Sequence, residues 1–547
     1  MIHNNTVTRK ARIMSVIALM IIGTGNTHGQ MKHHSEDTLG VVNFPVSCLP
    51  ASQTEFNRAM TLLHHMTYPQ AREMFHHITE HDSGCAMAYW GIAMTLFQPV
   101  WPTRPSPADL QHGWEVVQKA KSLNPLTRRE QLLIAALEEF FREPESSDYW
   151  KRIHAWAQGI EACYAVFPKD HEVAALYALA LVATVPPDHI SSSNNARAAD
   201  ILLRILKENA RHPGAMHYLI HANDTPGREH ESLEVLREYE AIAPHNPHAL
   251  HMPTHIYTRL GNWQEVIRGN IKAANAALAF PAGDHGQYVW DEFPHAIEYL
   301  IYAYLQMAAD DSAAAQLKRL QETEWLEPSF KTAFHLSSTK ARYMLERQAW
   351  TEAASIVPRE PSTVNWDRFP WPEAISWFAH GLGSVHVGNA PEAQRSRDRL
   401  AELEDVAAKA KEELFVRNTR ILRLELTAWL VYKQGMKDSS VTLMTQAAQL
   451  EASTPKHAVT PGPTLPGYEL LGDLLLEQGR QSEAFNEYTR SLELYPGRFN
   501  SLLGAVRSAR ALDSLQTAMK FYRQLVDGTS AESTREVLQE ARKFLSN

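Results

Sequence analysis

Residues 212–226 read HPGAMHYLIHANDTP, and residues 247–261 read PHALHMPTHIYTRLG. Each stretch carries two histidines four residues apart, which places each pair on one face of a helix. The four histidines are His217, His221, His251 and His255. The second pair follows the first by 34 residues at both positions. Because a step of about 34 residues is typical of stacked helix-turn-helix units, equivalent positions of two successive units carry the same imidazoles.

The rest of the chain also has the pattern of helices. From Phe44 onward, apolar residues recur at three- and four-residue spacing, with few alternating runs. Thr127 and Glu130 predict a capping box at the start of one such helix. The 547 residues are too many for one compact core, and 44% hydrophobic with 21% charged residues is typical of a folded protein. We therefore expect an all-α protein built as several domains or as an extended array.

The N-terminal residues 1–29 predict a cleaved secretory signal. A basic region with Arg9, Lys10 and Arg12 precedes the apolar run from Ile13 to Ile22, which is too short to span a bilayer. No later stretch is apolar for long enough to form a membrane helix. The net charge of −9 and the lack of a Lys/Arg cluster argue against nucleic acid as a partner. We expect a periplasmic or secreted protein without a transmembrane segment in its mature chain.

A proline-rich segment divides the chain. Residues 453–467 contain KHAVTPGPTLP, which must end any helix and predicts a linker. It separates a divergent helical array, residues 44–452, from C-terminal repeats in residues 468–547. In these repeats, small, aromatic and helix-ending residues have the spacing of a helix-turn-helix unit. They are Gly472, Gly479, Ala484, Tyr488 and Pro496, with Ala518 and Tyr522 34 residues after Ala484 and Tyr488.

These residues resemble the tetratricopeptide-repeat superfamily, most clearly from Tyr468 to Tyr522. More narrowly, FPVSCLP, GCAMAYWGIAM, the two histidine stretches, KHAVTPGPTLP and GRFNSLLGA resemble a group of bacterial tetratricopeptide-repeat proteins, many of them exported. The resemblance runs from Phe44 to Ala509 and implies helix pairs stacked as a superhelical solenoid with a concave groove. It also implies that the four histidines, at positions five and nine of their units, face this groove and not the packing core. A peptide, a protein or a small molecule is the expected occupant.

The histidines predict a metal site. Imidazole is a common ligand of zinc and copper, and histidines at i and i+4 of a helix can give two ligands to one ion. His295 and Glu298, three residues apart, are expected to add a nitrogen and a carboxylate. The expected outer-shell partners are Asp224, His248 and His285. Pro253 removes a helical hydrogen bond and should kink or restart the second helix.

Other interpretations stay open. Without a metal, the histidines would hydrogen-bond across the groove as structural spacers or contact an organic or peptide ligand directly. Three functions follow: a groove-binding protein with a polyhistidine metal site, a metal-free scaffold for protein–protein interaction, or a metal-dependent hydrolase or oxidase with Glu298 or Asp224 as proton acceptor. The chain has no HExxH, GxSxG, Walker or dinucleotide motif. The other histidine pairs, His64 with His65 and His76 with His77, are expected on the surface.

Three cysteines are present, Cys48, Cys85 and Cys163. Cys48 and Cys85 lie near the starts of the first helices of two successive predicted repeats, and such starts are neighbours in a stacked array. We therefore expect these two cysteines either to form a disulfide or to be buried free thiols. Cys163 falls within a helical pattern and is expected in the core.

Overall fold

The computed structural model describes residues 39–101, 104–146, 148–186, 193–283 and 286–546. Within these ranges the protein is all-helical, as the apolar spacing predicted, and strands are confined to a short antiparallel hairpin of β1 (Pro281–Ala282) and β2 (Tyr288–Val289). The expected signal segment, residues 1–29, and the expected outer-shell His285 lie outside the described residues.

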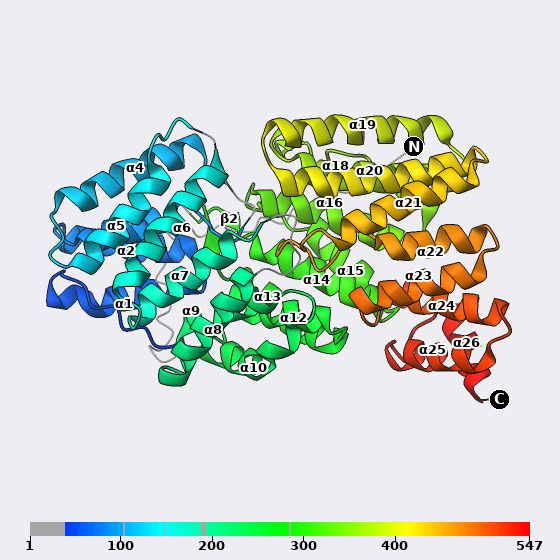
Figure 1. The fold of residues 1–547 in the computed structure, drawn as a ribbon, viewed down its shortest axis with the longest axis horizontal. Helices are drawn as coiled ribbons and strands as arrows, with labels where there is room; N and C mark the ends of the chain where they lie inside the picture. The colour runs from blue at the N-terminus through cyan, green and yellow to red at the C-terminus, as the bar shows by residue number, and fades with distance from the viewer. Residues whose placement is uncertain (1–38, 102–103, 147, 187–192, 284–285, 547) are drawn as a thin grey trace, which may run out of the picture. The chain divides into compact units, whose positions relative to one another are not determined.

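The helices of the first half lead up to the histidine stretches (Figure 1). They are α1 (Gln53–His64), α2 (Tyr68–His81), α3 (Ala86–Met94), α4 (Pro107–Ser122), α5 (Arg128–Phe141), α6 (Tyr149–Val166), α7 (His171–Ala183), α8 (Ser193–Glu208), α9 (Pro213–Asn223), α10 (Leu233–Ile242), α11 (Pro247–His251), α12 (Pro253–Arg259) and α13 (Trp263–Ala277). Short 3-10 helices lie at Pro50–Ser52 and Glu229–Ser232.

The helices of the second half follow the hairpin. They are α14 (Glu292–Gln306), α15 (Asp310–Gln321), α16 (Phe330–Leu345), α17 (Trp350–Ala354), α18 (Pro370–His386), α19 (Ala390–Lys409), α20 (Glu413–Lys433), α21 (Lys437–Ala452), α22 (Gly467–Glu477), α23 (Gln481–Leu494), α24 (Phe499–Ala511), α25 (Leu515–Asp527) and α26 (Glu536–Ser546). A 3-10 helix lies at Trp366–Arg368.

Helices that follow one another in sequence pack side by side, as α18 to α21 do in Figure 1. Small residues allow this close approach. A Cβ atom on Gly472 would lie 2.8 Å from the ring of Tyr488, and one on Gly504 would lie 2.3 Å from it. Tyr488 therefore fills the space between α22, α23 and α24, which is the packing predicted from the glycine and tyrosine positions.

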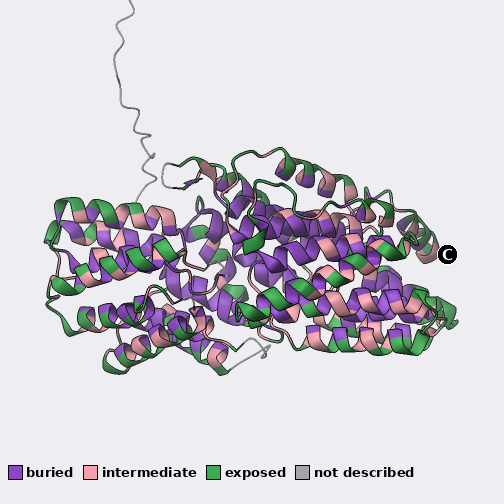
Figure 2. Cartoon of the chain, turned by 90° about the horizontal axis from the view of Figure 1, so that it is seen from above, coloured by how far each residue is buried: buried purple, intermediate pink, exposed green. Residues whose placement is uncertain are grey.

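Burial follows this pairing. Figure 2 shows buried residues where helices face one another and exposed residues on the outer faces of the helices. The predicted capping box is present at α5, where the Thr127 side chain accepts from the N–H of Glu130 and the Glu130 carboxylate accepts from the N–H of Thr127. None of the described helices is both long and apolar enough to cross a membrane.

The proline-rich segment, residues 453–467, ends α21, as its prolines predicted, but it runs through turns and bends up to the start of α22 at Gly467 and is packed against the helices. Arg342 of α16 donates to the carbonyl oxygens of Pro463 and Gly462 and, at 2.9 Å, to the hydroxyl of Thr460. Contacts group residues 37–547 into one compact unit, so no boundary between compact units falls at this segment.

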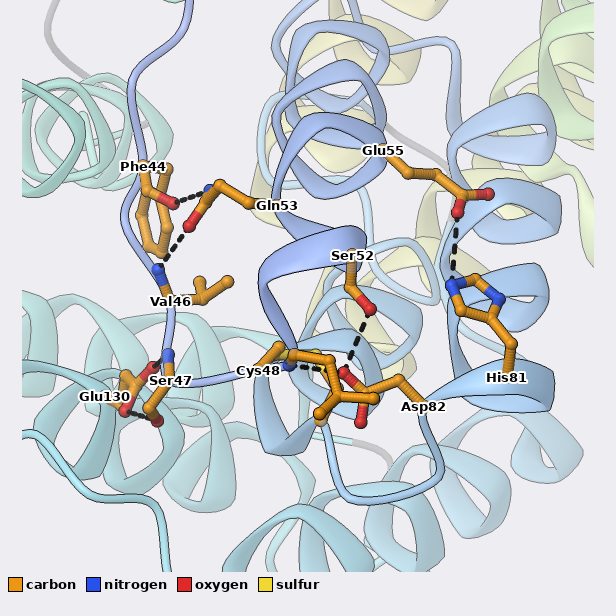
Figure 3. The surroundings of a disulfide bond; sticks show 12 residues. Phe44, Val46, Ser47, Cys48, Ser52, Gln53, Glu55, His81, Asp82 and Glu130 are labelled. Carbon is orange, nitrogen blue, oxygen red and sulfur yellow. Dashed lines mark hydrogen bonds and ion pairs between the residues drawn. A yellow bond between two sulfur atoms is a disulfide. The ribbon is translucent and has the colours of Figure 1, made fainter.

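Cys48 and Cys85 form a disulfide, with their Cα atoms 4.6 Å apart (Figure 3). Asp82 lies beside it and accepts from the N–H of Leu49 at 2.7 Å and from the hydroxyl of Ser52 at 2.9 Å. The bond therefore joins the segment before α1 to the N-cap of α3. Cys163 is a buried free thiol, as predicted.

Candidate metal centre

The repeat of 34 residues is kept in the helix starts. His212 and Asn246 are both N-caps followed by proline, and each side chain accepts the N–H of the residue three positions on, at 3.1 and 3.0 Å. Proline suits the first position of a helix because its missing N–H would be unbonded there. The same local chemistry thus starts α9 and α11, and it gives their histidines equivalent places in the two helices.

Pro253 interrupts the second helix, as predicted. α11 ends at His251 and α12 begins at Pro253, with the N–H of His255 bonded to the carbonyl of Met252 at 3.2 Å. The break does not separate the second histidine pair. The Nε2 atoms of His251 and His255 lie 3.0 Å apart.

The expectation that the histidines face an open groove is wrong. His217, His251 and His255 are fully buried, and His221 is 6% exposed. Helices α9 and α11 to α14 pack on one another here and enclose the side chains. Sequence periodicity indicates which residues share a helix face. It does not indicate whether a later element covers that face.

The structure divides the four histidines between two clusters. His217 and His221 lie with His248, and His251 and His255 lie with His295. In each cluster, one possible ligand atom from each side chain lies within 4.8 Å of the others. His248, expected in the outer shell, is therefore a member of the first cluster. Its position three residues before His251, on the same face, is the sequence signal for this role.

The first cluster is oriented by acceptors outside it. The Nδ1–H of His217 donates to the carbonyl of His64 at 2.6 Å, and that of His248 donates to Glu292 at 3.2 Å. These bonds leave the two Nε2 atoms facing each other at 3.0 Å. The Nε2 atom of His221 is buried and has no hydrogen-bond partner.

The second cluster has the same design. The Nδ1–H of His255 donates to Asp224 at 2.9 Å, and that of His251 donates to the Oδ1 atom of Asn270 at 2.6 Å. The amide of Asn270 is fixed because its Nδ2–H donates to the carbonyl of Val266 at 2.8 Å. The lone pairs of both Nε2 atoms are therefore left facing each other.

His295 is the third member of the second cluster, and a chain of hydrogen bonds through His335 to Glu298 orients its ring. The Nδ1–H of His335 donates to Glu298, so the Nε2 atom of His335 accepts from the Nδ1–H of His295 at 3.0 Å. The Nε2 atom of His295 is buried without a hydrogen-bond partner. Glu298 also accepts from Arg342 at 2.8 Å. The structure thus places Glu298, expected as a ligand, behind His335, a residue that sequence reasoning missed.

Five of the six cluster imidazoles have a lowered pKa, which favours their neutral form. Burial lowers the pKa of His255 to about 4, against the hydrogen bond to Asp224 that raises it. Burial, followed by neighbouring imidazoles, also lowers the pKa of four others well below the usual range. They are His217, His221, His251 and His295. Neutral imidazole is the form that binds a metal ion.

A third buried group contrasts with these clusters. His64 donates from Nε2 to Glu172 at 2.8 Å and accepts from the hydroxyl of Tyr218 at 3.0 Å. His212 lies 3.3 Å from the same carboxylate. The carboxylate of Glu172 therefore lies between two imidazoles, but the buried Nε2 atom of His212 has no hydrogen-bond partner.

The expected surface position of His64 and His65 is wrong, because both side chains are fully buried. His65 donates to the carbonyl of Leu39 at 3.0 Å and accepts from the hydroxyl of Tyr239 at 2.9 Å. His76 and His77 are exposed, as predicted.

Each cluster can therefore supply three imidazole nitrogens to one ion and leave a further coordination position for water or another ligand. The rings of His221 and His255 are 6.1 Å apart and those of His248 and His251 are 6.4 Å apart, so the two clusters are neighbours.

No protein-family model matches the chain, and no significant relative is found among curated proteins.

Proposed function

We propose that this chain is an exported helical-repeat protein of the tetratricopeptide type that binds two transition-metal ions, zinc or copper, in two adjacent three-histidine sites. His217, His221 and His248 hold the first ion. His251, His255 and His295 hold the second. The carboxylate predicted as a ligand, Glu298, supports His295 through His335.

The observation that carries the proposal is the pairing of facing Nε2 atoms of buried side chains. His251 and His255 each donate from Nδ1 to an oxygen acceptor, and their unprotonated Nε2 atoms then lie 3.0 Å apart. Two lone pairs at this distance repel each other unless a cation lies between them. A buried polar atom without a partner costs about 1 to 3 kcal/mol, and His221 and His295 add two such nitrogens.

The outer contacts also support a metal. A ligating histidine commonly donates its second N–H to a carboxylate or carbonyl, which fixes the tautomer. Five of the six histidines have such a partner or its equivalent. In the first cluster, His217 bonds the carbonyl of His64 and His248 bonds Glu292. In the second cluster, the partners of His251, His255 and His295 are Asn270, Asp224 and His335. Nitrogen donors alone suit zinc and copper better than magnesium or calcium.

Elemental analysis of protein purified without a histidine tag tests the proposal. We expect about two ions per chain, from one ion for each three-histidine set. His217→Gln with His248→Gln should remove one ion, and His251→Gln with His295→Gln should remove the other. His154→Gln, at an exposed position on α6, is the matched control and should remove none.

The rival function is a metal-free scaffold that presents a peptide- or protein-binding surface. In that case the facing nitrogens share a proton, and the protein holds substoichiometric metal that no histidine substitution changes. Binding of a peptide, protein or small molecule is common to both functions, so the metal content decides between them.

A further inference from the structure

The two histidine clusters differ in their access to a cavity. A cavity of about 160 Å³ has His221 in its wall, and none of the other five histidines lines it. The Nε2 atom of His221 is buried and has no hydrogen-bond partner. The cavity therefore reaches the first cluster at His221.

The second cluster is enclosed. The ring of Tyr299 lies 4.6 Å from that of His251 and 5.4 Å from that of His295, and the ring of Trp101 lies 5.7 Å from His295. The Tyr299 hydroxyl donates to the carbonyl of Thr460 at 3.2 Å, which holds this cover in place. An ion at this cluster would be shielded from the cavity.

Four aromatic side chains stand in the cavity wall, beside charged, polar and aliphatic ones. They are Trp101, Tyr149, Trp150 and Phe415. A cavity of about 150 Å³ lined by apolar side chains is large enough for benzene. The volume and the lining thus favour one small planar molecule over a peptide chain.

The two cations at the cavity are already paired. Arg104 donates to Glu412 at 2.9 and 3.0 Å and lies 3.9 Å above the ring of Tyr149. Lys456 lies 2.9 Å from Asp224. These cations therefore do not require an anionic ligand. A divalent ion held by three imidazoles would keep its positive charge, and this charge favours an anionic oxygen donor.

We propose, on the basis of the two-ion function above, that the first ion has an open coordination position on this cavity, which takes a small aromatic molecule with an anionic oxygen donor, such as an aryl carboxylate or a phenolate. The second ion is closed to such ligands.

Benzoate is the probe. Cyclohexanecarboxylate is the control, because it has the same carboxylate on a ring that is not planar. Full-length protein loaded with two equivalents of Cu(II) should bind one benzoate per chain, with a change in the electron paramagnetic resonance spectrum. Cyclohexanecarboxylate should bind at least about tenfold more weakly, a difference of about 1.4 kcal/mol.

Single-site proteins assign the position. The His251→Gln, His295→Gln protein, loaded with one Cu(II), should keep the benzoate response, and the His217→Gln, His248→Gln protein should lose it. Val182, on α7, lines the cavity and belongs to neither histidine cluster, so Val182→Trp should fill the cavity and keep the six histidines. It should keep both ions and weaken benzoate by about tenfold or more, through overpacking of the cavity.

The outcomes separate the two proposals. If the chain binds no copper at either cluster, the two-ion function fails. If both ions bind but benzoate changes neither spectrum, changes only that of the second site, or binds the Val182→Trp protein as tightly as the wild type, the open-site proposal is overturned and the two-ion function stands.

Discussion

The Nε2 atoms of His251 and His255 lie 3.0 Å apart although each ring already donates its Nδ1–H to an oxygen acceptor. This relationship distinguishes the centre from a histidine group that is built around a carboxylate. In the group of His64, Glu172 and His212, the carboxylate lies 2.8 Å from the Nε2 atom of His64 and 3.3 Å from that of His212. Between His251 and His255 there is no acceptor, only a second lone pair.

The acceptor of His251 should control the affinity of the second ion. Asn270→Leu keeps the volume but removes the Oδ1 atom that fixes the tautomer and the ring. Loss of such an outer contact weakens metal binding by about 10- to 100-fold, and the first ion should be unaffected. Competition with a chromophoric chelator measures both affinities. Asn275→Leu, exposed on the same helix, is the control, and equal affinity in the two variants would refute the role of Asn270.

Glu425 of α20 should make the protein less stable as the pH rises. Its side chain is fully buried, and neither carboxylate oxygen has a hydrogen-bond partner. Burial and then the nearby Glu451 raise the pKa of Glu425 well above its usual 4.5. The folded state then binds more protons than the unfolded state, so stability is complete below about pH 4.5 and falls as the pH rises towards the folded pKa.

Glu425→Gln tests this pH dependence, because glutamine is neutral at every pH. We expect the melting temperature of the variant to fall less than that of the wild type between pH 5 and pH 8, measured by scanning calorimetry. Glu413→Gln, exposed on the same helix, should leave the wild-type profile unchanged. Parallel profiles for Glu425→Gln and the wild type would contradict the prediction.

The disulfide should contribute strongly to stability. It closes a loop with a sequence separation of 37 residues. By the chain-entropy estimate, replacing Cys48 and Cys85 with serine lowers the free energy of unfolding by about 4 kcal/mol. Urea unfolding under oxidising conditions measures this loss. The control is Cys163→Ser, which replaces a cysteine that is not part of the disulfide. Three reactive thiols in the unreduced, unfolded wild type would show that the bridge is absent.

Arg498 should be critical for joining the C-terminal repeats to the preceding helices. It is fully buried and donates to Glu346 at 2.8 and 2.9 Å and to Glu469 at 2.7 and 3.0 Å. Arg498→Met leaves two buried carboxylates without their cation and should cost about 3 to 5 kcal/mol of unfolding free energy.

An exposed ion pair provides the comparison for Arg498. Arg510 and Glu540 are 45% and 57% exposed, and such pairs contribute less than about 1 kcal/mol. Arg510→Met should therefore change the urea midpoint little. A similar small change for Arg498→Met would mean that the buried network does not stabilise the fold.

The local sequence determined the helices and their repeat. His212 with Pro213, and Asn246 with Pro247, start two helices at a 34-residue step because an acceptor side chain followed by proline satisfies the first turn. Pro253 determined the break between α11 and α12. The i and i+4 spacing determined that each histidine pair shares a face, since this geometry depends only on the helix itself.

Only the tertiary structure decided what those faces meet. Asn270, Glu292 and His335 come from three other helices, 19 to 44 residues away from the histidines they bond. No local periodicity encodes these distances in sequence. Whether a histidine face is open or covered depends on the packing of later helices, and here α13 and α14 cover it. The sequence thus determined where the imidazoles stand on their helices, and the packing decided that they form two buried sets of three.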